Sequence, residues 1–184
     1  MNALAQHRRF FLAPLWVGAL LLLMVLAAAA AVYRSATTTT VIIVSHAESV
    51  LGSIADPPLA PEGEQRAEHL ARMLGVIGGP GQIAAIYVSR ARSAEQTAAA
   101  LAARLRLQSR NLPDGVTSDA AASTLRGAAR SRAVLVVTSA SSIPELVHAL
   151  SGIDVAPLRS DEPDAVYIIS MPSLGPASLL RMRY

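Results

Sequence analysis

The chain lacks cysteine and lysine, and aromatic residues make up only 4% of its 184 residues. Without cysteine it can form no disulfide, offer no thiol nucleophile and hold no thiolate-bound metal. Its basic side chains are 16 arginines, scattered among 13 acidic residues for a net charge of +3. Nucleic-acid binding needs basic residues gathered on one face and aromatic side chains that stack on bases. We therefore expect no nucleic-acid partner.

Motifs for metals and for phosphate loops are absent as well. No group of His, Asp and Glu residues has the spacing of metal ligands, and no glycine-rich phosphate loop occurs. We therefore expect no metal site and no bound cofactor. The sequence also shows no internal repeat, so a repeat architecture is not expected.

Charge is missing from the whole apolar run Phe10–Tyr33, which is long enough to span a membrane. Basic residues gather before the run, and only Arg34 follows it closely. The positive-inside rule then places the N-terminus in the cytoplasm. This predicts a cytoplasmic segment at 1–9, a transmembrane helix at 10–33, a linker at 34–40 and a domain at 41–184. The domain would lie outside the cytoplasm, on the periplasmic side of a bacterial inner membrane.

The alternative for this run is a cleaved signal peptide. The small residues Ala27–Ala31 follow an apolar stretch, as they do before a cleavage site. The length of the run favours an uncleaved signal anchor, in which Trp16 and Tyr33 would lie at the membrane interfaces. Both alternatives export the domain.

Beyond Thr40, segments with strand-like and helix-like patterns alternate. Predicted strands cover 41–44, 83–88, 134–137, 165–170 and 178–183, and predicted helices cover 61–74, 94–105, 120–129 and 143–150. The first strand, Val41–Val44, is continuously β-branched, as in a strand buried on both faces. The alternation predicts an α/β fold: a three-layer α/β/α sandwich with a mainly parallel sheet.

Five segments, in order, resemble the histidine phosphatase (phosphoglycerate mutase-like) superfamily, and in particular its small SixA-like branch. They are VIIVSHAES, DPPLAPEGEQRAEHLARML, IYVSRARSAEQTAAALAARL, VLVVTSASSIPELVHALSG and AVYIISMPSLGPASLLRMRY. The resemblance covers nearly all of the chain after Thr40. It implies the same three-layer fold, with the polar tips of the strands gathered at one edge of the sheet.

The resemblance also implies residue roles for phosphoryl transfer through a phosphohistidine. His46 falls on the nucleophile. Ser45 and Ser93 fall on two phosphate-binding arginines, and Ser139 falls on a second histidine. No residue is assigned as the acid that protonates the leaving oxygen. Three of the four phosphate-binding positions are therefore serine, so the active site is degenerate.

Catalysis of phosphoryl transfer depends on cations that stabilise the charge spread over the phosphoryl oxygens. Serine donates a hydrogen bond but brings no charge, so we expect an inactive or impaired enzyme unless Arg90 or Arg92 compensates. The leading hypothesis is a pseudophosphatase that acts as a binding or scaffolding module. The alternatives are a weak phosphomonoester phosphatase that uses His46 and a structural accessory subunit of a membrane complex. Partners would be the membrane through residues 10–33, another membrane protein or a phosphorylated ligand.

Two of the serines also have a purely structural interpretation. Ser93 with Gln96 and Ser142 with Glu145 have the spacing of helix capping boxes, in which the serine hydroxyl caps the helix. The pattern predicts that both serines are N-caps.

Overall fold

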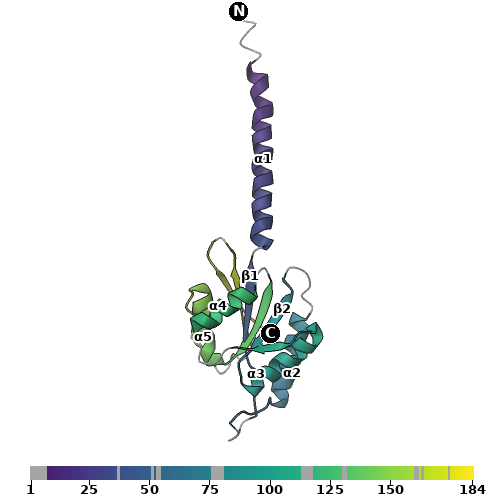
Figure 1. Cartoon of the computed structure of the whole chain (residues 1–184), viewed down its shortest axis with the longest axis vertical. Helices are drawn as coiled ribbons and strands as arrows, with labels where there is room; N and C mark the ends of the chain where they lie inside the picture. Colours follow the sequence, from purple (N-terminus) through teal and green to yellow (C-terminus); the bar gives the residue numbers. More distant parts are fainter. Residues whose placement is uncertain are drawn as a thin grey trace, which may run out of the picture. The chain divides into compact units, whose positions relative to one another are not determined.

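The computed structural model describes residues 8–36, 38–50, 52, 55–75, 81–112, 118–129, 132–159, 162, 164–173 and 175–184. The chain forms two compact units that meet between Ala36 and Thr37. The first contains one long helix, α1 (Arg8–Ala36; Figure 1). Its Trp16–Tyr33 portion has a mean hydropathy of 2.3 and buries nothing within the protein. By length and composition α1 can cross a membrane, and a signal sequence would have the same character.

The structure differs from the predicted linker at 34–40. Helix α1 continues to Ala36, and strand β1 begins at Thr39, so this stretch contains the end of one element and the start of the next. The helix continues because neither glycine nor proline follows Tyr33 to stop it.

The second unit is built on a six-stranded sheet with the order β3-β2-β4-β1-β5-β6. The strands are β1 (Thr39–Ser45), β2 (Ile83–Val88), β3 (Ser109–Asn111), β4 (Ala133–Thr138), β5 (Ala165–Met171) and β6 (Ser178–Arg183). Strands β1 to β4 pair in parallel, whereas β5 pairs antiparallel with both β1 and β6. The sheet is therefore mixed, and its parallel part carries the strand ends at which the predicted site lies.

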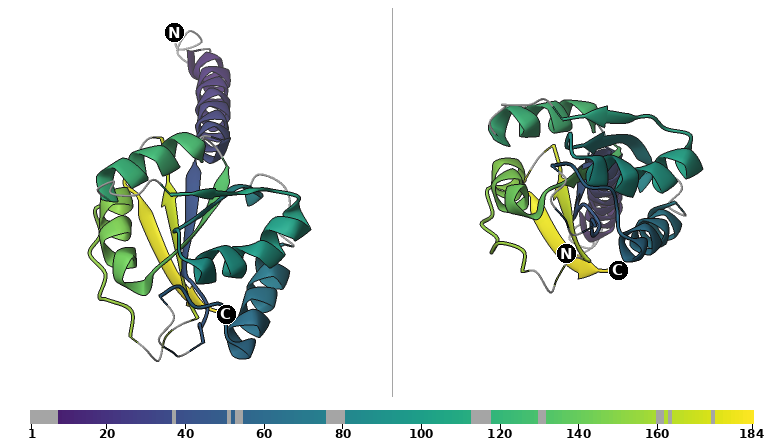
Figure 2. Two further views of the ribbon diagram at one scale, coloured as in Figure 1. Left: turned by 60° about the horizontal axis from the view of Figure 1, so that its bottom comes forward. Right: turned by 90° about the horizontal axis from the view of Figure 1, so that it is seen from below.

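Helices cover both faces of this sheet (Figure 2). Helices α2 (Pro61–Leu74) and α3 (Arg92–Leu105) pack on one face, and α4 (Ser118–Ala128) and α5 (Ile143–Ser151) pack on the other. Strand β1 contributes side chains to the hydrophobic cores on both faces of the sheet, because successive side chains of a strand point to opposite faces. Ile42 and Val44 lie in the core under α2 and α3, and Val41 and Ile43 lie in the core under α4 and α5. The predicted three-layer fold is confirmed.

Both predicted capping boxes are wrong. Helix α3 begins one residue before Ser93, which is buried in its first turn, and the carboxylate of Asp56 accepts the Arg92 N–H at 2.9 Å instead. Ser142 occupies the N-cap position of α5, as predicted, but its side chain makes no capping hydrogen bond. Its backbone is already helical (φ −86°, ψ −13°) because a 3-10 turn, η2 (Ala140–Ser142), leads into the helix. Helix α5 ends at Gly152, whose φ of 72° is left-handed.

Candidate functional site

The ends of β1, β2 and β4 lie at one edge of the sheet. Ser45 pairs with Thr138 in the β1–β4 register, and the His46 N–H donates to the Thr138 carbonyl at 2.9 Å. The Ser89 N–H, directly after β2, donates to the Val137 carbonyl at 2.9 Å. The first residues beyond these three strands therefore start from the same edge, as parallel strands require.

His46 has a defined ring orientation at this edge. Its Nδ1 lies 3.1 Å from the carbonyl oxygen of Ala47. A carbonyl can only accept a hydrogen bond, so this contact places a proton on Nδ1, and in the neutral ring the lone pair is then on Nε2. In that neutral form the half-buried ring could act as a nucleophile or a general base.

A buried hydroxyl links His46 to helix α3. The Ala47 N–H donates to Thr97 Oγ1 at 2.9 Å, and the Thr97 hydroxyl donates to the Ser93 carbonyl at 2.6 Å. Thr97 is completely buried, and Ser93 is 5% exposed. The start of α3 is therefore fixed to the His46 loop by neutral groups, and Ser93 contributes its backbone to that link.

Ser139, directly after β4, belongs to a cluster of hydroxyl groups. Its Oγ lies 3.0 Å from Ser141 Oγ and 2.7 Å from Ser142 Oγ. Ser45, at the end of β1, is 4% exposed. Of the three serines at the predicted phosphate-binding positions, Ser45 and Ser93 are buried and Ser139 bonds to neighbouring hydroxyl groups.

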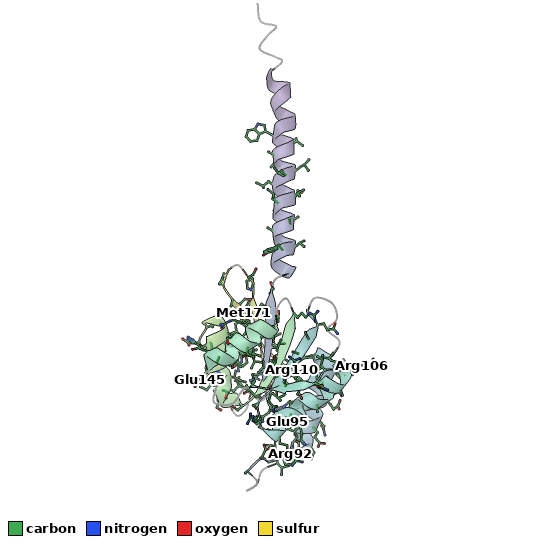
Figure 3. The ribbon with its side chains drawn as sticks, in the orientation of Figure 1. Arg92, Glu95, Arg106, Arg110, Glu145 and Met171 are labelled. Carbon is green, nitrogen blue, oxygen red and sulfur yellow. The ribbon has the colours of Figure 1, made fainter. Side chains whose placement is uncertain are left out.

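A pocket of about 750 Å³ opens beside His46. Its polar side chains come from Ser45, His46, Glu48, Ser49, Glu62, Arg66 and Arg159. Ser93 and Ser139 do not line it, and neither do Arg90 and Arg92. Figure 3 shows the Arg92 side chain at the start of α3, where its backbone is capped by Asp56.

Arg66 is a pocket residue that the sequence did not single out. It projects from α2, and its side chain is 12% exposed. Its Nη1 lies 2.7 Å from Glu48 Oε1, and its Nη2 donates to the His46 carbonyl at 3.4 Å. The cation therefore holds the loop that carries His46, and its charge is offset by Glu48.

Gly63 brings α2 close enough for this contact. A Cβ atom on Gly63 would lie 2.2 Å from the carbonyl oxygen of Glu48, nearer than any side chain tolerates. The Ala60 N–H donates to the same carbonyl at 2.8 Å. The glycine in the segment LAPEG, which the resemblance includes, marks this close approach.

The second pocket arginine, Arg159, comes from the segment between α5 and β5. The Glu162 N–H donates to the Arg159 carbonyl at 3.0 Å, and the Glu162 carboxylate accepts hydrogen bonds from Arg181 and, at 2.6 Å, from Arg183. The hydrogen bond from Arg181, joined by that from Arg183, holds the pKa of Glu162 below its ordinary value of 4.5. Glu162 therefore ties the segment carrying Arg159 to strand β6.

Tyr184 packs against α2, with its ring centroid 6.1 Å from that of His69. Burial raises the pKa of Tyr184, and the positive charge of Arg66 acts in the opposite direction. The tyrosine thus supports the same helix that carries Arg66.

The sequence and the fold of the chain are both similar to those of known proteins. The family described as histidine phosphatase superfamily (branch 1) matches residues 41–114. The chain is similar to this superfamily over those residues, and its fold resembles that of solved members of the superfamily. The matched residues run from β1 through β3 and include His46, Gly63, Arg66 and Ser93. No curated protein matches the sequence.

Solved histidine phosphatases share the fold. The protein histidine phosphatase SixA, complexed with tungstate, is 23% identical with a TM-score of 0.63, over 78% of this chain and 96% of that one. A SixA protein from Nakamurella multipartitia is 24% identical with a TM-score of 0.55, over 79% of this chain and 96% of that one. A mycobacterial glucosyl-3-phosphoglycerate phosphatase is 16% identical with a TM-score of 0.55, over 72% of this chain and 90% of that one. The chain has a phosphoglycerate mutase-like fold, consistent with the SixA-like branch.

In this fold the chain keeps a histidine at the end of β1, but serines stand at the positions predicted to hold the phosphate-binding arginines and the second histidine. The pocket has two arginines and two glutamates, Glu48 and Glu62, so these fixed charges cancel. A phosphate dianion is stabilised where preorganised cations and donors outnumber competing anions. The described pocket has no such excess from its arginines and glutamates.

Proposed function

We propose that the protein is a membrane-anchored pseudophosphatase whose domain acts as a binding or scaffolding module outside the cytoplasm. The observation that carries the proposal is the charge balance beside His46. Serine occupies three of the four phosphate-binding positions, and the pocket lining has two glutamates as well as two arginines. Loss of one preorganised donor costs about 2.7–4 kcal/mol of transition-state stabilisation. Several such losses would leave little turnover, although they do not simply add.

The proposed anchor is the apolar part of α1, with residues 1–9 in the cytoplasm and the domain on the periplasmic side. The supporting observations are the length of α1 and the basic residues that precede its apolar run. Intact-mass measurement on protein purified from membranes tests this part. A mass that lacks the first 29 to 31 residues would identify a cleaved signal peptide instead.

One observation favours a second function, a weak phosphatase that uses His46. The Nδ1 contact with the Ala47 carbonyl would leave Nε2 of a neutral ring as the nucleophile, and two arginines line the pocket. In this alternative the compensating charge would come from Arg66 and Arg159 instead of Arg90 and Arg92, which were predicted from the sequence. Glu48 would have to release Arg66 for this to work, because the two form an ion pair at 2.7 Å.

Steady-state hydrolysis of p-nitrophenyl phosphate by the full chain in detergent distinguishes the two functions. The pseudophosphatase should give near-background rates that do not change in His46→Ala, and His148→Ala, outside this pocket, serves as the control. The triple variant Ser45→Arg, Ser93→Arg, Ser139→His should gain phosphate binding if the backbone geometry has been kept. A wild-type rate of about 1 per second or more, lost in His46→Ala, would replace the first function with the second.

A further inference from the structure

The two edge strands of the sheet differ in character (Figure 2). One edge is β3, which has three polar residues and is too short to offer much pairing to another chain. The other edge is β6, which has six residues, pairs with β5 in an unbroken register and contains no proline or glycine. A long, regular edge strand is a template for a further strand. Strand β6 is therefore the edge at which this sheet can be extended.

The backbone of β6 directs hydrogen-bonding groups away from the sheet at every second residue. The Tyr184 N–H, one position beyond β6, donates to the Asp164 carbonyl at 3.3 Å. Hydrogen-bonded and non-hydrogen-bonded pairs alternate along antiparallel strands. Counted back from Tyr184, the outward N–H and C=O groups therefore belong to Leu179, Arg181 and Arg183. No residue in the described part of the chain bonds to these outward groups.

Two large apolar side chains of β6 are exposed on one face of the strand. Leu180 is 58% exposed and Met182 is 38% exposed. Both lie on the α2/α3 face of the sheet, because their partners on β5 pack in or against the core under those helices. Outside α1, the other large apolar side chains that the described residues expose, Val50 and Ile153, lie in loops. Adjacent exposed apolar side chains on an edge strand mark an interaction surface.

The charged side chains of β6 do not protect this edge from pairing. Arg181 and Arg183 both donate to the Glu162 carboxylate, and Arg183 Nε lies 3.9 Å from Asp164 Oδ1. Arg181 also lies over the ring of Tyr167, 5.6 Å from its centroid, on the α4/α5 face. Two carboxylates thus offset the two arginines. The edge has no surplus charge that would repel a second copy or select an acidic or basic partner.

We propose that β6 pairs antiparallel with β6 of a second copy of this chain, around a two-fold axis at Leu180. A symmetric pair must align outward groups with outward groups, so its axis passes through a residue. An axis at Leu180 sets the two copies of this side chain opposite each other and pairs Met182 with Ser178. An axis at Arg181 would set two arginines opposite each other, which is unfavourable. The two six-stranded sheets then form one continuous sheet.

This contact is small for a dimer in free solution. Specific protein interfaces bury about 1,600 Å² in total, and one pair of short strands provides only part of such an area. Confinement raises the effective concentration of two binding surfaces and so offsets a weak contact. Here the inference rests on the proposed function, because the membrane anchor proposed for α1 supplies that confinement.

Disulfide cross-linking tests the pair, because the natural chain has no cysteine. Directly opposite residues of a non-hydrogen-bonded antiparallel pair have Cα atoms about 4.5 Å apart. This distance is within the range in which a disulfide forms. The full-length Leu180→Cys chain, reconstituted in liposomes and treated with a mild oxidant, should therefore give a cross-linked dimer on a non-reducing gel.

The matched control is Ser178→Cys. Ser178 is exposed and lies on the same face of β6, so its thiol meets the oxidant and random collisions in the same way. In the proposed pair, however, its own copy lies about four residues away along the partner strand, on the order of 13 Å. This variant should cross-link at least about tenfold more slowly, because that separation exceeds the reach of a disulfide.

Two substitutions at Arg181, each in the Leu180→Cys chain, test the backbone pairing. Arg181→Pro removes the outward N–H and leaves the hydrogen bonds with β5 in place. Arg181→Ala removes the same ion pair but keeps the N–H. Because the symmetric pair loses two hydrogen bonds, Arg181→Pro should cross-link about tenfold more slowly than Arg181→Ala. A thermal melt checks that both variants are folded. If Arg181→Pro unfolds, the comparison of Leu180→Cys with Ser178→Cys decides.

The inference is overturned if Leu180→Cys gives no cross-linked dimer, if Ser178→Cys cross-links as fast, or if the two folded Arg181 variants cross-link alike. It is also overturned if, in native membranes, the thiol of Leu180→Cys is shielded from maleimide without cross-linking, since a different partner would then cover the edge. A failure of the proposed function appears separately. A missing anchor is detected by intact mass in the same samples, and phosphatase activity by turnover of p-nitrophenyl phosphate.

Discussion

Two groups of residues hold the loops at the strand ends near His46, one through charged side chains and the other through hydroxyl groups. The charged side consists of His46, Glu48, Gly63 and Arg66, and it joins β1 to α2 through an ion pair and a close backbone approach. The hydroxyl side consists of Ser93, Thr97, Ser139, Ser141 and Ser142; its neutral hydrogen bonds link α3 to Ala47 and, separately, bridge the serines of the β4–η2 turn.

The difference shows that the fold needs the hydrogen bonds at the strand ends but not the cations of a phosphate site. Hydroxyl groups satisfy the backbone at the ends of β1 and α3, as buried polar groups require. The charge that remains lies on the α2 side, where Arg66 holds a backbone carbonyl and a glutamate. A domain of this kind can keep its pocket while losing its chemistry.

The largest effect should come from breaking the charged side at Gly63. In Gly63→Ala the new Cβ would meet the Glu48 carbonyl at 2.2 Å, so α2 must move away from the His46 loop. We expect a loss of about 2–3 kcal/mol in the free energy of unfolding, measured by urea denaturation. Gly127→Ala on α4 is the control, because nothing lies within 4 Å of its Cβ, and it should stabilise by up to about 1 kcal/mol. Equal stabilities of the two variants would contradict the close approach.

A smaller effect should come from the hydroxyl side. Thr97→Val keeps the shape but leaves the Ala47 N–H without its acceptor, which should cost about 1–2 kcal/mol. The control is Thr124→Val on α4, where an exposed hydroxyl donates to Ala120, and it should change stability by less than about 0.5 kcal/mol. If Thr97→Val were as stable as the control, the hydrogen bonds that link the His46 loop to α3 would not contribute to the free energy of unfolding.

The smallest effect on stability at neutral pH should come from Glu162→Gln. This variant tests the ion pairs of Glu162 with Arg181 and Arg183, which hold the segment that carries Arg159. Because the folded-state pKa of Glu162 is lowered, its contribution is present above the ordinary value of 4.5 and is lost as pH falls through the folded-state pKa. Wild-type melting temperature should therefore fall more steeply than that of the variant below about pH 5. If the melting temperatures of the two proteins fell equally steeply below about pH 5, the ion pairs with Arg181 and Arg183 would not stabilise the protein in solution.

Most of the fold could be predicted from the sequence, because its strands and helices have strong local patterns. The predicted bounds of α2, β2 and β6 match the structure, and Val41–Val44 and Val134–Val137 lie inside β1 and β4. Strand β3 was not predicted, because Ser109–Asn111 is short, polar and exposed. Such an edge strand forms through its pairing with β2 and leaves no hydrophobic pattern.

The site was less predictable, because its contacts join residues far apart in the sequence. His46 could be picked out from the strand that precedes it. The cap of α3 could not, since Asp56 reaches it from another loop. Arg66 and Arg159 follow no local motif, and only the packing of α2 and the segment after α5 brings them to one pocket. Arg90 and Arg92, which lie close to Ser93 in the sequence, do not line this pocket.

The most direct test of the account is whether His46 accepts a phosphoryl group. The full chain is mixed with radiolabelled p-nitrophenyl phosphate, quenched in alkali and analysed for protein-bound label, with His46→Ala as the reference. An impaired site predicts no more label on the wild type than on His46→Ala, since the pocket has no excess of fixed cations to hold the dianion. Near-stoichiometric, acid-labile label on the wild type that disappears in His46→Ala would contradict the account and establish a working phosphohistidine.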